Sequence, residues 1–195
     1  MRIEKVKLYR FEELNEEAKT KALETLRGWN VENCDWYEAS FYDWTMKLEE
    51  MGYINSDIQF SGFWSQGDGA CFSSGIDLAK WLEGRRIKSK YQKLVGKAIL
   101  TIGTSGRYSH EYSMGLSLDL LEDLTEKQSI LLDELTDIVI EEARDTAKQI
   151  YRDLEKEYEY MTSDEALTEY FTDNDYDFEA NGKMWRERRW YESRL

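Results

Sequence analysis

The longest regular pattern of apolar positions lies between residues 126 and 161. Apolar residues recur there at steps of three and four, which places them on one face of a helix. The stripe consists of Leu132, Leu135, Val139, Ala143, Ala147, Ile150, Leu154, Tyr158 and Met161. Thr125 and Gln128 form a capping box at its start. We expect a helix of about 54 Å, longer than the roughly 42 Å diameter of a compact domain of this size. It must therefore break, overhang or pack on a second copy of itself.

Alternating polar and apolar positions predict two β-hairpins. Residues 57–74 form the first, around the loop Ser65-Gln66-Gly67-Asp68-Gly69. Residues 98–103 and 108–120 form the second. Seven residues of the last segment share one parity, which predicts a long strand with one face on a core. They are Tyr108, His110, Tyr112, Met114, Leu116, Leu118 and Leu120.

The remaining pattern predicts shorter elements at both ends of the chain. Residues 2–9 alternate as a strand, and Asn15 can cap a helix that reaches Gly28. Further helices are expected at 35–51 (ending at Gly52), at 77–83, within 85–97, and from a cap at Thr162 to Phe171. The pair Asn181-Gly182 suits a type I′ turn, so residues 176–185 should form a terminal hairpin.

Together these elements predict an α+β fold. We expect an antiparallel sheet of four or five strands covered by helices, with one long acidic C-terminal helix and a terminal β-hairpin. The length fits a single domain over 1–195, in which residues 126–195 could form an appendage. We find no apolar window of membrane-spanning length and no signal-like N-terminus. Cys34 and Cys71 fit free thiols. We therefore expect a soluble protein of the bacterial cytoplasm.

Charge is distributed very unevenly along the chain. The net charge is −14, and the stretch from Glu126 to Glu179 holds 18 acidic residues against 5 basic ones. Such a surface repels nucleic acid and anionic lipid and is attracted to a basic groove. A run of cations lies upstream: Arg85, Arg86, Lys88, Lys90, Lys93 and Lys97. This run could bind nucleic acid. The net charge favours two other interpretations: a solvated helix face, or docking on the acidic helix of the same or a second chain.

The acidic segment is the predicted partner-binding surface. Carboxylates at steps of three and four destabilise an isolated helix, so a cationic partner would gain from them. Exposed aromatic residues beside them would supply the anchors that lose water on binding. The predicted set is Glu134, Asp137, Glu141, Glu142, Asp145, Tyr158, Tyr160, Asp173, Asp175, Asp177 and Trp185.

Candidate chemistry is sparse. The single histidine, His110, could join Trp64, Gln66 and Asp68 in a ligand pocket, although a structural histidine and a plain turn are the favoured interpretations. The run from Asp173 to Asp177 begins like a calcium loop but departs from that motif at Phe178 and Met184. We assign no catalytic residue, no metal and no cofactor.

Three segments carry a resemblance to known proteins. The first is Phe60-Ser61-Gly62-Phe63-Trp64-Ser65-Gln66-Gly67-Asp68-Gly69-Ala70; the others run from Phe11 to Lys19 and from Arg107 to Glu111. They resemble small acidic proteins of bacteriophages and prophages, a group that includes an inhibitor of type II CRISPR nucleases. The resemblance implies a mobile-element origin and an intracellular role. It carries over no catalytic residue.

These observations lead to one functional expectation and two alternatives. We expect a non-enzymatic anti-defence protein that binds a host defence protein, in the first place a type II CRISPR nuclease, through an acidic surface that mimics nucleic acid. The alternatives are an antitoxin that covers a basic toxin, and a small-ligand binder or hydrolase built on Gln66, Asp68 and His110. Neither direct nucleic-acid binding nor membrane binding is expected, and a second copy could pack along the long helix.

Overall fold

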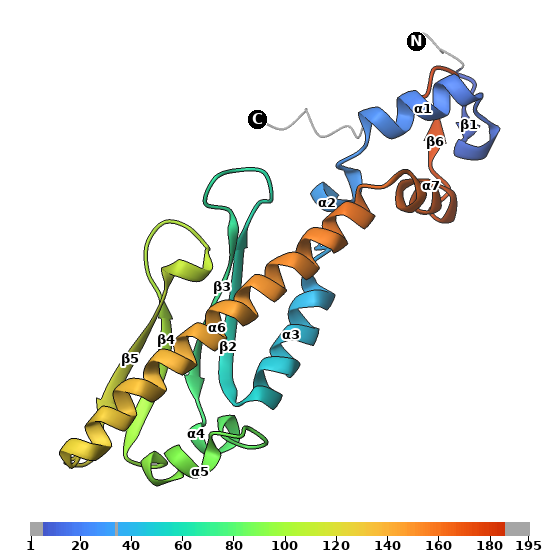
Figure 1. The fold of residues 1–195 in the computed structure, drawn as a ribbon. Coiled ribbons are helices and arrows are strands. Elements are labelled where there is room, and N and C mark those ends of the chain that lie inside the picture. Colours follow the sequence, from blue (N-terminus) through green and yellow to red (C-terminus); the bar gives the residue numbers. More distant parts are fainter. Residues whose placement is uncertain (1–5, 34, 186–195) are drawn as a thin grey trace, which may run out of the picture. The chain divides into compact units, whose positions relative to one another are not determined.

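The chain forms two compact units. The structure, a computed structural model, describes residues 6–33 and 35–185 (Figure 1). One unit spans Tyr37–Lys156, and the other combines the segment up to Trp36 with the segment from Glu157 onward. No helix in the described part of the chain combines the length and the apolar character that a bilayer crossing requires.

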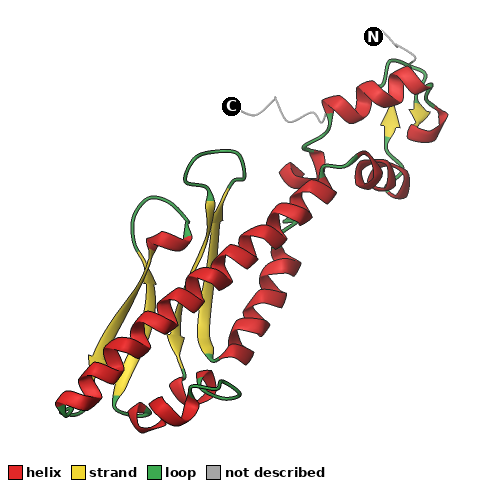
Figure 2. Ribbon diagram, in the orientation of Figure 1, coloured by secondary structure: helices red, strands yellow, loops and turns green. Residues whose placement is uncertain are grey.

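The Tyr37–Lys156 unit is built on a four-stranded antiparallel sheet, as the sequence predicts (Figure 2). Its strands follow chain order: β2 (Tyr53–Ser61), β3 (Gly69–Ile76), β4 (Ala98–Thr104) and β5 (Met114–Leu120). The helices of this unit are α3 (Glu38–Met51), α4 (Leu78–Trp81), α5 (Lys88–Tyr91), the 3-10 turns η2 (Gln92–Leu94) and η3 (Glu111–Ser113), and most of α6 (Glu126–Met161). The predicted α+β class is confirmed.

Helix α6 is continuous over its 36 residues. The buried residues of the helix reproduce the predicted stripe from Leu132 to Leu154, while Tyr158 and Met161 are half-buried. The capping box is present: the N–H of Thr125 donates to Oε1 of Gln128 at 3.0 Å, and the N–H of Gln128 donates to Oγ1 of Thr125 at 3.4 Å. Of the three expectations for so long a helix, a break is therefore wrong.

Strand β4 shows how the sheet is oriented. Ala98, Leu100 and Ile102 are buried, whereas Ile99 and Thr101 on the opposite face are exposed. Burial that alternates in this way means that this part of the sheet has one covered face and one open face.

The prediction of a strand from 108 to 120 is wrong in its first half. Residues 108–110 leave the sheet and the chain turns through η3, so β5 begins only at Met114. Of the seven residues expected on the buried face, Met114 is buried, Leu116 and His110 are half-buried, and the others are exposed. The displaced loop approaches β3: a Cβ added at Gly69 would lie 3.1 Å from the backbone of His110. The loop of residues 108–113 therefore packs on β3 instead of extending strand β5 toward its N-terminus.

The second unit is small and centred on aromatic residues. It contains β1 (Tyr9–Arg10), η1 (Phe11–Glu13), α1 (Glu16–Thr25), α2 (Trp29–Asn33), α7 (Asp164–Asp173) and β6 (Asp177–Phe178), and β1 pairs with β6. Phe11, Phe171 and Phe178 meet at centroid distances of 5.4–5.7 Å. They share a core with Leu14, Ala18, Ala22, Leu167 and Met184.

Three predictions in this unit need correction. Residues 6–8 form no strand, so only Tyr9 of the expected 2–9 strand is in one, and residues 1–5 lie outside the described residues. Ser163, not Thr162, caps α7, because its hydroxyl accepts the N–H of Ala166 at 3.2 Å. The terminal hairpin is present in short form, with the N–H of Trp185 donating to the carbonyl of Asp177 at 2.7 Å.

The turn of that hairpin differs from the type I′ expectation. A type I′ turn needs positive φ at both central residues. Gly182 has φ 82°, but Asn181 is not among the residues with positive φ. The N–H of Gly182 donates to the carbonyl of Glu179 at 2.9 Å, and the N–H of Glu179 donates to the carbonyl of Lys183 at 2.8 Å. Three residues therefore connect the two arms.

Gly52 joins α3 to β2 at a point where backbone segments touch. Its φ is 95°, the left-handed region that glycine tolerates best. A Cβ there would lie 2.5 Å from the backbone nitrogen of Trp81. Gly84 also has positive φ, at 75°, but a Cβ there meets nothing within 4 Å. The two positions differ chiefly in the space around them.

We expect Gly52→Ala to destabilise the protein more than Gly84→Ala. In both variants an alanine in the left-handed region lowers the free energy of unfolding by about 1–2 kcal/mol. Only Gly52→Ala also forces overlap with α4, which lowers it further by at least about 1 kcal/mol. Urea unfolding of the two variants beside the parent chain measures the difference. Equal losses would show that the approach of Trp81 to Gly52 does not constrain the fold.

Candidate functional site

The carboxylates in the middle of α6 are largely paired within the chain. Glu134 lies 2.6 Å from Lys90, Glu141 lies 2.9 Å from Arg144, and Asp145 lies 3.0 Å from Lys148. The lysine beside it lowers the pKa of Glu134. These exposed pairs add little stability, but each offsets the negative charge that a partner would meet.

Glu142 is part of the fold rather than of an open surface. It forms an ion pair with Arg85, whose guanidinium lies 4.1 Å from the ring centroid of buried Trp81. Arg85 also donates to the backbone carbonyl of Trp81. An Arg held by a ring, a carbonyl and a carboxylate at once anchors α4 to α6.

Part of the basic run is engaged within the chain. Arg85 and Lys90 form ion pairs with carboxylates of α6, and Lys97 forms one with Glu122, which precedes that helix. The first two contacts fit docking on the acidic helix of the same chain, while the function of the run as a whole stays a prediction.

The remaining predicted acids have different surroundings. Asp175 and Asp177 both pair with Arg10 across the β1–β6 sheet, and the Asp177 contact raises the pKa of Arg10. Asp137 and Asp173 have no ion pair within the described residues. The predicted acidic set is thus divided between the two units, and most of its members are neutralised locally.

One surface of the smaller unit keeps its negative charge. Tyr160, near the end of α6, is 48% exposed and lies among Glu157 and the α7 residues Glu165 and Glu169. The charge of Glu169 is the largest cause that raises the pKa of Tyr160, followed by burial and by Glu165. Within the described residues none of these three glutamates has an ion pair. We call Glu157, Tyr160, Glu165, Glu169 and Asp173 the Tyr160 patch.

The Tyr160 patch includes a hollow of about 250 Å³. Its walls are mixed: Tyr160, Met161 and Tyr170 supply apolar surface, and Glu169, Asp173 and Asn174 supply polar atoms. A second hollow along α7 is also acidic, because Glu165, Glu169 and Asp173 line it together with Thr168 and Thr172. A hollow with aromatic walls and an acidic rim suits a long cationic side chain.

Two of the predicted aromatic anchors lie elsewhere. Tyr158 is half-buried and packs edge-on against Trp36, with ring centroids 5.6 Å apart. Trp185 is half-buried in a different hollow, beside Met184 and Gly182. Of the Tyr160 patch, the set predicted from the sequence contains Tyr160 and Asp173 but not Glu157, Glu165 and Glu169. In α7, Glu165, Glu169 and Asp173 recur at steps of four, a spacing that places them on one face of the helix, whereas Glu157 lies near the end of α6.

The predicted ligand pocket is only partly assembled. A hollow of about 370 Å³ between two loops is lined by His110 together with Gly67, Arg107, Tyr108 and Tyr112. Trp64, Gln66 and Asp68 are not among its lining residues. Asp68 instead holds its own loop, because Oδ2 accepts the N–H groups of Trp64 at 2.9 Å and Ser65 at 2.7 Å.

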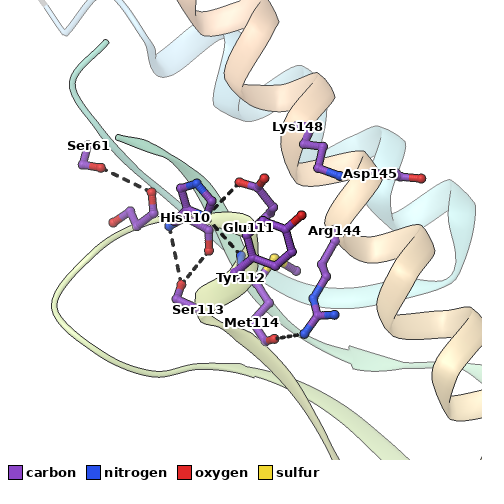
Figure 3. A network of polar contacts seen from close by, with 10 residues as sticks. Ser61, His110, Glu111, Tyr112, Ser113, Met114, Arg144, Asp145 and Lys148 are labelled. Carbon is purple, nitrogen blue, oxygen red and sulfur yellow. Dashed lines mark hydrogen bonds and ion pairs between the residues drawn. The ribbon is translucent and has the colours of Figure 1, made fainter. Parts of the chain in front are cut away.

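The side chain of His110 makes its contacts within its own turn (Figure 3). Its Nδ1 accepts the N–H of Tyr112 at 3.2 Å and lies 3.0 Å from Oε2 of Glu111. Its ring stacks on Tyr112, with centroids 5.4 Å apart, and Arg144 and Lys148 lie 5.7 and 5.9 Å from the Tyr112 ring. These contacts are those of a structural histidine that caps η3.

The fold and its surfaces define a small α+β protein with an acidic and aromatic face. The chain belongs to a family described as a domain of unknown function, DUF8835, whose model matches residues 36–164. The match includes the whole sheet and α6, and it ends at the first residue of α7. No curated protein and no solved structure matches the chain.

We expect Glu165→Gln and Glu169→Gln to lower the pKa of Tyr160 toward its ordinary value of about 10. Nearby carboxylates disfavour the phenolate, so the phenol stays protonated to higher pH than usual. Titration of ¹³C-labelled tyrosines by NMR, with the signal assigned through Tyr160→Phe, measures the shift.

Glu24→Gln is the matched control for that titration, since Glu24 is exposed on α1 of the same unit and is not among the causes of the shift. An equal change in all three variants, or none in any, would contradict a local field at Tyr160.

Proposed function

We propose that this protein acts by binding rather than by catalysis, and that it docks on a cationic surface of another macromolecule through the Tyr160 patch. The observation that carries the proposal is the concentration of glutamates around an exposed tyrosine, without ion pairs among the described residues. Burying unpaired carboxylates is costly, so the natural counterpart of this surface brings its own lysines or arginines.

Charge supports this assignment in a second way. The whole chain carries −14, so its long-range field attracts cationic partners and speeds their encounter. Most carboxylates in the middle of α6 already have cations beside them, whereas among residues 6–33 and 35–185 those of the patch have no ion pair. The long-range field would therefore bring a cationic partner near, and the patch would offer it carboxylates.

The hollow beside Tyr160 supports a specific contact rather than diffuse attraction. Binding energy at interfaces concentrates in a few aromatic or arginine anchors that lose water. Tyr160 and Tyr170 supply such an anchor on this side, and an arginine of the partner would enter between them and Glu169. Arginine on aromatic faces is favoured even at exposed sites, by about 0.5–1 kcal/mol.

The partner class comes from the resemblance in three segments of the chain. We propose a host defence protein, and first a type II CRISPR nuclease, whose nucleic-acid channel is basic. An acidic protein seated in that channel would exclude nucleic acid. In this role the protein is an anti-defence protein of a mobile element, acting in the bacterial cytoplasm.

The test uses two variants with the same change in charge. Glu165→Gln/Glu169→Gln/Asp173→Asn neutralises the patch, and Glu134→Gln/Glu141→Gln/Asp145→Asn neutralises three carboxylates that are paired within the chain. We expect the first variant to lose about tenfold or more in affinity for purified type II CRISPR nucleases, since each neutralised contact costs on the order of 1 kcal/mol. The second should lose much less, and the parent affinity should fall with salt.

Two outcomes contradict parts of this proposal separately. If no nuclease in a panel binds the parent chain at low salt, the proposed partner is wrong. If a nuclease binds but both variants lose equally, net charge and not the Tyr160 patch governs docking.

A further inference from the structure

Strand β5 is an edge strand of the four-stranded sheet. The sheet order is β2-β3-β4-β5, and within the described residues no other strand pairs with β5. It pairs with β4 without a break in register over all seven of its residues, from Met114 opposite Thr104 to Leu120 opposite Ala98. A regular edge of this kind is a template for another strand.

The ladder shows which backbone groups point outward. The N–H of Leu121 donates to the carbonyl of Lys97, and the N–H of Ser105 donates to the carbonyl of Ser113, both at 2.9 Å. Odd-numbered residues of β5 are therefore those that bond to β4, and even-numbered residues direct their N–H and C=O groups away from it. The carbonyl of Met114 is already used by Arg144, at 3.2 Å. Leu116, Leu118 and Leu120 remain.

The side chains of the same residues are also incompletely covered. Leu118 is 36% exposed and Leu120 is 54% exposed, although both share a face with buried Leu100 and Ala98 of β4. Leu121, next along the chain, is 58% exposed. The free backbone edge and the incompletely covered end of this apolar face thus occur at the same residues.

The usual protection of an edge strand is missing here. Native edges carry lysines, prolines, bulges or inward-pointing charges that prevent pairing. The sequence of β5 is Met-Gly-Leu-Ser-Leu-Asp-Leu, and its one charge, Asp119, is on the face opposite to the leucines. An occupant of this edge should therefore be uncharged and should alternate in the same way.

We infer that a second copy of this chain occupies the β5 edge, through antiparallel β5–β5 pairing about a two-fold axis at Leu118. In this register Leu118 faces Leu118 of the second copy and Leu116 faces Leu120, so all outward backbone groups that are free find partners. Leucine meets leucine on the covered face, and Asp119 faces the uncharged Ser117 of the second copy.

Self-complementarity selects a second copy over a different chain. At a two-fold interface the same strand contributes both sides, so its residue pattern must be alike when read in either direction from the axis. In β5 the positions two residues before and two residues after Leu118 are both leucines, and no carboxylate lies directly opposite another. The two sheets would join into one of eight strands, which is within the usual range of about 2–10 strands.

The first test measures the molecular mass of the protein in solution at several protein concentrations. Sedimentation of the parent chain should show a monomer of 23.2 kDa in equilibrium with a species of twice that mass. Salt should favour the dimer, because it screens the repulsion between two chains of charge −14. Salt has the opposite effect on docking through the Tyr160 patch, so the two associations are distinguishable. A parent chain that stays monomeric at all concentrations and salt levels would overturn the inference.

Variants then locate the interface. Leu118→Lys and Leu120→Lys should each weaken dimer formation by about tenfold or more. In Leu118→Lys two like charges meet at the axis, and in Leu120→Lys a lysine replaces the leucine that faces Leu116, so apolar contact is lost. Tyr42→Lys on α3, at a residue that is 68% exposed, is the control and should leave the dimer unchanged. Unaltered melting temperatures establish that the variants fold. A dimer that persists equally in all three variants lies elsewhere.

Cysteine cross-linking tests the register. Ser117 faces Asp119 of the second copy, at a pair whose Cα atoms are about 4.5 Å apart. A mixture of Ser117→Cys and Asp119→Cys chains should form a disulfide-linked heterodimer under mild oxidation, several-fold faster than either variant with itself and faster than the parent chain. Faster linkage of Ser117→Cys with itself would overturn the axis at Leu118.

Discussion

The packing of one face of α6 constrains most of the structure. Burying the residues from Leu132 to Leu154 fixes the rotation of the helix about its axis, and that rotation decides where every carboxylate of the helix points. Glu142 meets Arg85, and Glu134 meets Lys90, because the buried stripe leaves them beside α4 and α5. The hydrophobic stripe therefore determines which carboxylates of α6 form ion pairs within the chain and which face solvent.

Where the apolar pattern is long and regular, the sequence predicts this fold well. The stripe of α6, the two hairpins of the sheet, and the caps at Asn15 and Thr125 follow from periodicity and side-chain hydrogen bonding, which are local properties. The prediction for the segment 108–113 is wrong, because the alternation there fits a strand only locally. A tertiary demand, the covering of β3 near Gly69 and Cys71, takes it out of the sheet.

The candidate site shows the same limit. Acidic residues can be counted along a chain, but the chain alone does not show which of them have a cation within reach. Lys90 and Glu134 are 44 residues apart in sequence, yet their side chains touch. Composition predicts Tyr160 and Asp173 as candidate partner-binding residues, while Glu165 and Glu169 become candidates only because the structure places them beside Tyr160.

The loop that η3 forms over β3 has a consequence for the thiol beneath it. Cys71 is 1% exposed, and burial is the largest cause that raises its pKa, so the sulfur is both covered and held in its protonated form. Oxidants and alkylating reagents attack thiolates. Modification of Cys71 therefore requires that the loop around His110 open first. The rate at which this thiol reacts would then report how often the loop opens.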